Sequence, residues 1–538
     1  MAKHLPTELS FLVMTLSINS TMLTELEGAL TDLSIRDGFE LLDSALNTPA
    51  RFRYPNPDAI SLLLCLAQWI DIGYRNLDAL NDLYAPLASL DIGQLSFLEF
   101  LQLRMIEGFC NLATENHTGA ISVLGAALSV GEATMWPHLK FVAHFWKSRA
   151  HRRAGEYEAA SSHLAAAKEI IQAVDAPKLL AIVKIHESWL LFQRGDRRHA
   201  LRLLDEAEAE LKPIGHALFL GNIESARGRF VRRAGEYAKA LQHFENAIEM
   251  YSVSYALHPN CARALVNAAY VKRLIALDMQ AGGGGQATGS NHARYLLLID
   301  EALELLERAR KIYAADHHQS GTGAVLVNVG HLHLEGGDID RASLEAGKAY
   351  DLGSDKRDQI LMARARILQS AVELARAEEQ MGDDPDVALH AALAAEYGQE
   401  AIELATHTQN RRLLAEAYIV RATAAADDTY QDWELAKKCV SQASDLLSHE
   451  DRDHLAGEIK RLKARILRST GIEHSLRQWS DGQNGNKTFQ QIQEEFAEIF
   501  IPKVWINNGK NITKVAKVLS VSPKKIRRIL RNCGYREV

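Results

Sequence analysis

Proline is scarce in this sequence, with 12 among 538 residues. Because proline has no backbone N–H to donate inside a helix, its scarcity favours long uninterrupted helices. Aromatic residues make up only 7% of the chain and hydrophobic residues 47%, so we expect a core of small and aliphatic side chains. The length exceeds what one ordinary core accommodates, so the chain forms either several domains or an extended array.

Cysteines are also few, and they are scattered. No two are close enough in sequence for a metal-binding knuckle or a CxxC motif. We interpret them as free thiols in a reducing compartment, mostly packed as small apolar side chains. They are Cys65, Cys110, Cys261, Cys439 and Cys533.

Long hydrophobic runs are missing. The most apolar stretch, LLLCLAQWI (Leu62–Ile70), has about half the length that a bilayer-spanning helix needs. The N-terminal MAKHLPTELSFLVMTLS has no charged lead and no small-residue cleavage site, so it predicts the start of a helix rather than a signal peptide. We expect a cytoplasmic protein without a membrane partner.

Catalytic and cofactor motifs are absent as well: there is no HExxH, GxSxG or GxGxxG. His331 and His333 would lie about 200° apart on a helix, so they cannot bind one metal ion from one face. The run QAGGGGQATGS at 280–290 lacks the lysine of a phosphate-binding loop, and we interpret it as a flexible surface loop. We therefore expect no enzyme, no metal and no cofactor.

What the sequence does contain is an internal repeat. RRAGEY occurs at the start of Arg152–Ala167 and again at the start of Arg232–Ala247, and a degraded copy spans Phe192–Ala207. The copies are equally spaced with a period of 40, and apolar positions stay in phase over four units. A fixed period of this size predicts an array of supersecondary units. The in-phase positions are Ala120, Ala160, Ala200 and Ala240; Leu124, Leu164, Leu204 and Phe244; and Ala127, Ala167, Ala207 and Ala247.

One unit can be read as two antiparallel helices. Gly155 can adopt the positive φ that often ends a helix, and a second helix is expected to begin at about Glu156. In that helix, Tyr157, Ala160 and Leu164 share one face. The small alanines let the paired helices approach closely, and the larger residue between them fills the groove.

This pattern resembles the tetratricopeptide repeat family. Two positions depart from it, because Glu224 and Arg227 replace an expected Trp and Leu, and the period is 40 rather than about 34. The longer units are similar to those of large bacterial transcription regulators of the MalT type, although the ATPase module of those proteins is not visible here. The positions that match the family are Gly228, Gly235, Tyr237, Ala240, Phe244 and Ala247.

The resemblance implies an all-α fold in which residues 1–475 form a tetratricopeptide-like solenoid of about eleven helical hairpins. The clearest units are 106–250, 326–350 and 413–447. The phase slips between Ala240 and Ala302, where the glycine-rich run lies. Residues 476–487, rich in Gly and Asn, are interpreted as a linker.

The composition changes at the C-terminus. From Lys487 to Val538, 11 Lys and Arg residues face 4 Asp and Glu residues, a net charge of +7. The whole chain carries −7, so residues 1–486 carry about −14. A basic segment attached to an acidic body is typical of nucleic-acid binding, whereas the alternative is a solvated basic tail.

Amphipathic helices favour the first interpretation. Helices are predicted over 489–506, 511–520 and 521–535. Asn511 is the expected N-cap of the second helix, and Ser522 is the N-cap of the third, followed by proline at the first helical position. A short helix, a turn and a basic helix are typical of a helix-turn-helix.

The segment NGKNITKVAKVLSVSPKKIRRILRNCGY resembles the Fis-type helix-turn-helix that ends many bacterial enhancer-binding regulators. The resemblance covers residues 488–538, about a tenth of the chain, and implies a third helix that reads DNA. It departs from the family at Ser520, which replaces the turn glycine. The matching positions are Pro502, Gly509, Asn511, Ala516, Leu519, Val521, Ile526, Leu530 and Gly534.

Helical geometry divides the third helix into two sides. Ile526, Ile529, Leu530 and Cys533 are predicted to be buried. Arginine suits guanine edges, and arginine and lysine both suit phosphates. We assign Lys524 and Arg528 to base edges. The remaining predicted DNA contacts are Lys525, Arg527 and Arg531 near phosphates, Lys514 and Lys517 of the preceding helix on the DNA backbone, and Thr513 and Ser522.

In that family the first helices pair into a two-fold dimer, so helix 489–506 is a candidate homodimer seam. The alternative is a core face within one protomer. The candidate seam residues are Phe489, Ile492, Phe496, Ile499 and Phe500.

Two functions remain. In the first, the protein is a transcriptional regulator that binds double-stranded DNA, and its solenoid groove binds a protein, peptide or small effector. In the second, it is a protein-interaction scaffold, and the basic module attaches it to nucleic acid without sequence preference.

Overall fold

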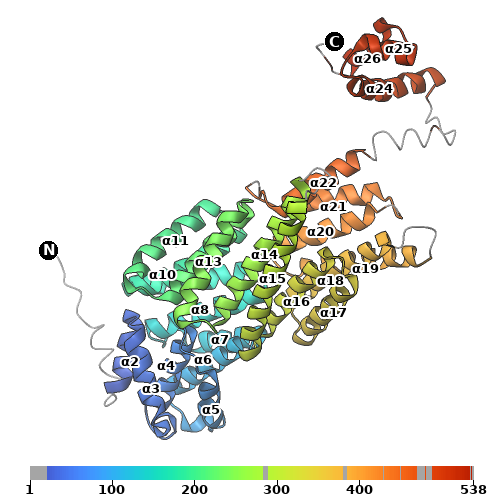
Figure 1. The fold of residues 1–538 in the computed structure, drawn as a ribbon. Helices are drawn as coiled ribbons and strands as arrows, with labels where there is room; N and C mark the ends of the chain where they lie inside the picture. Colours follow the sequence, from blue (N-terminus) through green and yellow to red (C-terminus); the bar gives the residue numbers. More distant parts are fainter. Residues whose placement is uncertain are drawn as a thin grey trace.

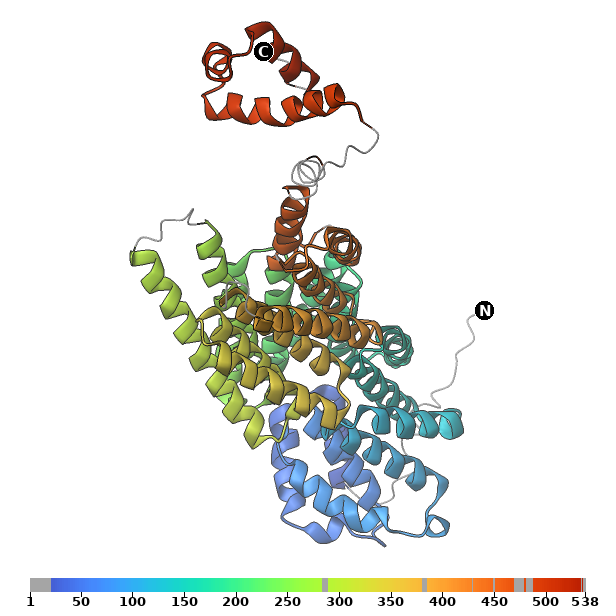
Figure 2. The same ribbon diagram turned by 90° about the vertical axis from the view of Figure 1, so that its right-hand side faces the viewer.

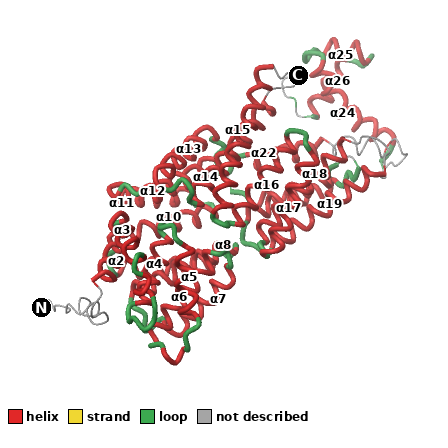
Figure 3. Tube along the Cα trace, turned by 60° about the horizontal axis from the view of Figure 1, so that its bottom comes forward, coloured by secondary structure: helices red, strands yellow, loops and turns green. Residues whose placement is uncertain are grey.

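The structure is a computed structural model that describes residues 21–282, 289–379, 385–427, 429–448, 450–468, 479, 487–533 and 535. All regular elements in these ranges are helices (Figure 3). Four expectations fall wholly or largely outside them: the helix start within residues 1–20, the centre of the glycine-rich run at 283–288, most of the linker 476–487, and Gly534 at the end of the chain.

Ten consecutive helix pairs and one further helix, α22, make up the body in the described residues, against the eleven pairs expected (Figure 1). The array is tetratricopeptide-like. Short 3-10 helices occur at Pro49–Phe52, Ile92–Gln94 and Lys212–Ile214. The helices are α2 (Thr21–Asp32), α3 (Ile35–Leu46), α4 (Ala59–Asp71), α5 (Leu77–Ala88), α6 (Phe97–Ala113), α7 (His117–Gly131), α8 (Pro137–Ala154), α9 (Tyr157–Ala173), α10 (Pro177–Gln193), α11 (Arg197–Leu211), α12 (Ala217–Arg233), α13 (Tyr237–Ser254), α14 (Pro259–Gly282), α15 (Gly289–Ala315), α16 (Gln319–Glu335), α17 (Ile339–Lys356), α18 (Gln359–Glu379), α19 (Pro385–Thr406), α20 (Arg411–Ala425), α21 (Trp433–Leu446) and α22 (His454–Arg468).

The predicted period is confirmed by the helix starts. Helices α6, α8, α10 and α12 begin at residues 97, 137, 177 and 217. All twelve in-phase positions are buried, each at most 3% exposed. The first helix of a pair leaves room for the larger residue, because a Cβ on Gly228 would lie 2.9 Å from the ring of Phe244. The alternation of small and large residues therefore sets how closely paired helices approach.

The repeated glycine lies in the turn between two paired helices, as its sequence position predicts. Gly155, Gly195 and Gly235 have φ angles of 84°, 92° and 79°, which L side chains rarely adopt. The next helix begins two residues later in each case. Glu224 and Arg227, the two departures from the family pattern, form an ion pair with each other, in which Arg227 Nη1 lies 3.3 Å from Glu224 Oε1.

The phase slip is produced by a long hairpin. Helices α14 and α15 have 24 and 27 residues, and the starts of α14 and α16, at Pro259 and Gln319, are further apart than one period. The predicted surface loop over 280–290 is therefore wrong at both ends, where α14 continues to Gly282 and α15 begins at Gly289. Continuing an existing helix adds one hydrogen bond for each residue fixed, which outweighs the poor propensity of glycine at these ends.

The array winds back on itself, so that turns far apart in sequence touch (Figures 1 and 2). The Gln409 N–H donates to the Gly155 carbonyl at 3.0 Å, and the Arg452 N–H donates to the Arg233 carbonyl at 2.9 Å. The Gln319 N–H donates to Glu115 Oε2 at 2.8 Å. These closing contacts tie the middle hairpins to the later ones.

The C-terminal helices form a core of their own. They are α24 (Phe489–Asn507), α25 (Ile512–Leu519) and α26 (Pro523–Asn532). The three predicted helices are thus confirmed, as are both N-caps: Asn511 Oδ1 accepts from the Lys514 N–H at 3.0 Å, and Ser522 Oγ accepts from the Lys525 N–H at 3.3 Å. The buried residues of this core are Ile501, Trp505, Val515, Ile526, Ile529 and Leu530.

The cysteines are free in the structure. Three are buried and Cys110 is half-buried, as expected for small apolar side chains. The predicted burial of Cys533 is wrong, because this residue is exposed one position beyond the end of α26. Its thiol donates a hydrogen bond to the Glu498 carbonyl at 3.4 Å instead.

Candidate functional site

The predicted DNA-binding residues all lie on or beside α25 and α26, and all are exposed. The buried side of α26 is formed by Ile526, Ile529 and Leu530, so its basic residues project outward. The two helices thereby gather one cationic surface. The exposed residues are Thr513, Lys514, Lys517, Ser522, Lys524, Lys525, Arg527, Arg528 and Arg531.

The turn between the two helices keeps its geometry without a glycine. Ser520 has φ 52° and ψ 36°, the left-handed conformation that a turn glycine would adopt. Its N–H donates to the Ala516 carbonyl, and the Val521 N–H donates to the same carbonyl at 3.1 Å. A serine in this conformation carries a conformational cost that glycine does not.

Five of the cations on this surface are not neutralised within the described residues. Lys514, Lys517, Lys524, Arg527 and Arg528 have no carboxylate at ion-pair distance there, whereas Lys487 Nζ lies 2.7 Å from Glu495 Oε2 at the start of α24. Unpaired exposed cations leave a local positive potential.

Helix α24 presents apolar side chains to solvent. Phe489, Phe496 and Phe500 are 75%, 41% and 41% exposed, and the rings of the last two stack at 5.4 Å. The opposite side of the helix, with Ile501 and Trp505, faces the three-helix core. The alternative of a core face within one protomer is therefore wrong for these phenylalanines.

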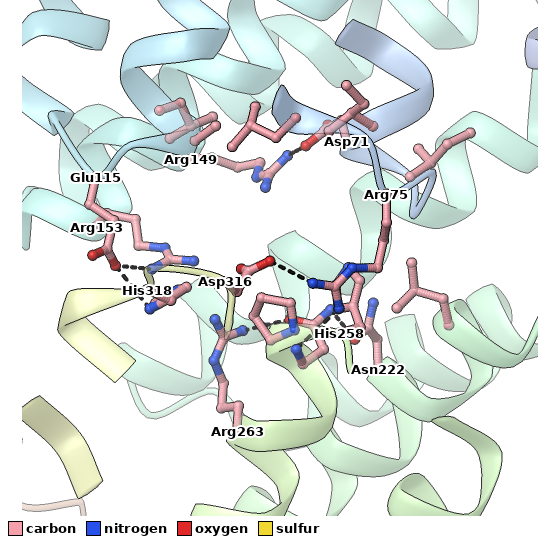
Figure 4. A pocket seen from close by; sticks show the side chains of 18 of the residues that line it. Asp71, Arg75, Glu115, Arg149, Arg153, Asn222, His258, Arg263, Asp316 and His318 are labelled. Carbon is pink, nitrogen blue, oxygen red and sulfur yellow. Dashed lines mark hydrogen bonds and ion pairs between the residues drawn. The ribbon is translucent and has the colours of Figure 1, made fainter. Parts of the chain in front are cut away.

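A second candidate site, which the sequence did not predict, lies inside the body. It is a cavity of about 720 Å³ bordered mainly by the first helices of the pairs from α4 to α14, together with the turns before α7 and α16. Figure 4 shows Arg75, Arg149, Arg153 and Arg263 around its open space.

The cavity carries an excess of positive charge. Six arginines and Lys356 line it, against only four carboxylates. His186, His258 and His318 are held neutral, because burial lowers the pKa of His258 and of His318 to about 3 and lowers the pKa of His186 well below its ordinary value. The arginines are Arg75, Arg149, Arg152, Arg153, Arg229 and Arg263, and the carboxylates are Asp71, Asp78, Glu115 and Asp316.

Two of the arginines are well compensated at the rim of the cavity (Figure 4). Arg149 forms an ion pair with Asp71, and Arg75 Nη2 lies 2.8 Å from Asp316 Oδ1. Arg153 is weakly compensated, since its Nη1 lies 4.0 Å from Glu115 Oε1.

Three arginines have no carboxylate partner among the described residues. Arg152 and Arg229 each keep an Nε that is shielded from solvent and has no hydrogen-bond partner there. Arg263 Nη1 donates only to the amide oxygen of Asn260, at 3.1 Å. The Arg152 guanidinium lies 5.0 Å from the centre of the Trp189 ring, which holds it in place without neutralising it.

Burial and mutual repulsion disfavour the charges of Arg152, Arg153 and Arg229. Burial, and then the neighbouring guanidinium groups, lower the pKa of Arg229 to about 10 and that of Arg153 to about 10. Burial also lowers the pKa of Arg152, and Arg153, Arg263, Arg149 and Arg229 add repulsion. Since guanidinium groups stay protonated at neutral pH, the cavity holds several uncompensated charges at close range.

The signal for this site was present in the repeat. The two RRAGEY copies extend backwards to an arginine three positions earlier, so that the pattern of Arg149, Arg152 and Arg153 recurs two periods later. Basic residues in the last turn of a helix are ordinarily explained by the helix dipole, which is why the pattern alone did not reveal an inward-facing cluster. The recurring residues are Arg229, Arg232 and Arg233, and of these three Arg229 lines the cavity.

Within the described residues, no group of three or more His, Cys, Asp or Glu side chains is placed to hold a metal ion. Among those residues, no helix has the length and apolarity that a membrane crossing requires.

No protein-family model matches the chain, and no match to a curated protein is found. Among solved structures, the chain is similar to a Rap protein complexed with competence and sporulation factor, with TM-score 0.46 and 13% identity over 72% of this chain and 99% of that one. It is similar to the apo quorum sensor NprR from B. thuringiensis, with TM-score 0.48 and 11% identity over 70% and 97%. A STAND protein with a tetratricopeptide repeat sensor from Pyrococcus horikoshii gives TM-score 0.38 and 13% identity over 87% and 68%.

Proposed function

We propose that this protein is a DNA-binding transcriptional regulator. In this proposal α24–α26 form a Fis-type helix-turn-helix that binds double-stranded DNA, and the helical array binds a protein, peptide or small effector. The observation that carries the proposal is the outward-facing basic surface of α26, which follows a left-handed turn at Ser520 and contains Lys524 and Arg528 without carboxylate partners among the described residues.

The geometry fits major-groove binding. In a helix-turn-helix, the second helix enters the major groove while the first crosses the backbone. Arg528 lies on the side of α26 away from buried Ile526 and Leu530, where it can reach base edges. Lys514 lies in the first turn of α25, where it is placed to contact a phosphate. No catalytic role is proposed for either domain.

The exposed phenylalanines of α24 support a homodimer. A strip of exposed aromatic side chains on one helix face is unfavourable in water and is typical of an interaction surface. Pairing two copies of α24 would cover Phe489, Phe496 and Phe500, and it would present two α26 helices to two half-sites.

A truncation tests where DNA binding resides. The chain ending at Gly482 is expected to lose DNA affinity while keeping its helical circular-dichroism signal, because the basic helices are removed and the body is not. Undiminished DNA binding by the truncated chain would end the proposal.

Two point variants separate sequence reading from attachment. Arg528→Ala is expected to lose about 1 to 3 kcal/mol on a selected site and to relax preference at one position, because a base contact is removed. Lys514→Ala is expected to weaken all sequences alike and to reduce the salt slope by about one charge per protomer.

The measurement is affinity for a selected site and a scrambled site across a salt series. Lys311→Ala, which removes an exposed lysine on α15, is the charge-matched control. It should change neither the affinity for the two sites nor the salt slope. Equal losses on both sites for Arg528→Ala would instead favour the scaffold that binds nucleic acid without sequence preference.

A further inference from the structure

The arginine cavity in the body is an unbalanced site. Its lining holds seven cationic side chains and four carboxylates, an excess of three positive charges. Like charges brought together away from bulk water repel one another strongly, and leaving a buried charge without a partner is destabilising. A cavity that keeps such charges gains stability when an anion enters it.

The unpartnered donors point to the anion's chemistry. Arg152, Arg229 and Arg263 have no carboxylate partner among the described residues. Guanidinium groups offer paired donors that match the oxygens of a phosphate or carboxylate. Three arginines near one another, with an excess charge of about three, suit a ligand that carries several negative charges in a small volume, as linked phosphates do.

The cavity also has an apolar wall. Phe145, Ile182, Ile185 and Trp189 line it alongside the arginines. Phe145 is fixed by His186, with ring centres 4.9 Å apart. A wall of this kind offers contact area to a ring or another apolar group of the ligand.

The size of the cavity limits the ligand. About 720 Å³ falls within the range of small-molecule sites, which is about 300 to 1,000 Å³. That space accommodates a small molecule or a few residues of a peptide, and it does not accommodate a folded domain.

We infer that the cavity binds a small molecule that joins two or more phosphate groups to an aromatic ring, as a nucleotide does. Arg152, Arg229 and Arg263 contact the phosphates, and the wall formed by Phe145 and Trp189 contacts the ring. The inference deepens the proposed function by naming the chemical class of the effector, and it rests on that function only for the link to DNA.

Binding is tested on the full chain without DNA. ATP and inorganic pyrophosphate are titrated at constant ionic strength, with sodium chloride as the reference, and thermal unfolding and calorimetry are followed. Both phosphates are expected to stabilise the protein saturably, and ATP is expected to bind more tightly because its ring contacts the apolar wall.

Variants locate the site. Arg229→Gln and Arg263→Gln are expected to weaken ATP binding at least about tenfold, the size of losing one charge-assisted hydrogen bond. Arg310→Gln, which changes an exposed arginine paired with Glu307 on α15, should bind ATP as the unaltered chain does. Arg229→Gln should also raise the melting temperature of the ligand-free protein, because it removes repulsion, and this readout shows that the variant is folded.

Three results would overturn the inference. One is stabilisation that matches sodium chloride at equal ionic strength. Another is ATP binding that survives both cavity variants. The third is binding of an acidic peptide such as poly-glutamate in the cavity with no binding of ATP or pyrophosphate. DNA affinity is measured separately, so a chain that binds DNA but no phosphate refutes this inference and leaves the proposed function intact.

Discussion

Replacing Gly235 by alanine tests whether the array is held closed by contacts between distant turns. Gly235 has φ 79°, so any other residue there bears a left-handed backbone that costs roughly 1 to 2 kcal/mol. In addition, a Cβ at this position would lie 2.7 Å from the Arg452 carbonyl oxygen. That atom belongs to the backbone of the turn before α22, so the turn itself must move.

Moving that turn breaks a closing contact. The Arg452 N–H donates to the Arg233 carbonyl at 2.9 Å, and a hydrogen bond of this kind contributes about 0.5 to 1.5 kcal/mol. Gly235→Ala is therefore expected to destabilise the protein by about 2 to 3 kcal/mol.

A matched control separates the two costs. Gly337 occupies the same turn position in the hairpin of α16 and α17, with φ 81°, and a Cβ there meets nothing within 4 Å. Gly337→Ala should therefore show only the backbone cost of about 1 to 2 kcal/mol.

Urea unfolding of the full chain measures both variants, and hydrogen exchange at Arg452 reports the local contact. Faster exchange at Arg452 is expected in Gly235→Ala alone. Equal destabilisation by the two alanines, with unchanged exchange at Arg452, would refute the claim that this contact closes the array.

Three further changes have defined directions. Ser520→Gly should stabilise the C-terminal helices by about 1 kcal/mol, seen as slower hydrogen exchange in α26, because glycine adopts the left-handed turn without strain; faster exchange would contradict this. Ala240→Leu should cost about 1 to 3 kcal/mol in urea unfolding, because a fully buried alanine leaves no room for the added atoms; no change would contradict the repeat register. Burial lowers the pKa of His258 from its ordinary 6.5 to about 3, so the neutral imidazole contributes fully to stability above about pH 6.5. That contribution is lost as the pH falls toward 3, because the unfolded chain binds a proton that the folded chain does not. His258→Gln should therefore reduce the change in the urea midpoint between pH 7 and 5, and an unchanged pH dependence would contradict this.

Much of the local fold could be predicted from the sequence because it depends on neighbours along the chain. Ala160 and Leu164 share a face at helical spacing, and both are buried as expected. Gly155 ends α8 with a positive φ, and Asn511 caps α25, as their sequence positions predicted. Periodicity and capping are properties of a few adjacent residues, so one sequence suffices to infer them.

The closing contacts could not be predicted because the period encodes only how one unit packs on the next. Nothing in the repeat indicates that Gln409 reaches the carbonyl of Gly155, or that Arg452 reaches that of Arg233. The curvature that brings them together accumulates over several pairs, including the long pair of α14 and α15. In the sequence, this long pair was marked only by the phase slip at the glycine-rich run.

The cavity was missed for the same reason. Arg152 lies in the last turn of its helix, and in sequence it is indistinguishable from a surface residue that complements the helix dipole. Only the superhelical path brings it close to Arg229 and Arg263, which lie on α12 and α14, two and three pairs further along. The recurrence of Arg149 as Arg229 after two periods was a local sign of a shared inward direction, because both residues line the cavity.

The closing contacts and the cavity are linked in space, and this sets how a ligand could act on the body. Arg75 and Asp316 pair at the rim, and Glu115, which accepts from Gln319, lines the same cavity. An anion bound there would bridge helices that the closing contacts already hold together, so its binding would add to the stability of the closed array. A ligand shifts a conformational equilibrium only by its difference in affinity for the two states. If the anion raises DNA affinity by some factor, DNA must raise the affinity for the anion by that same factor, and measuring both factors decides whether the two sites are coupled.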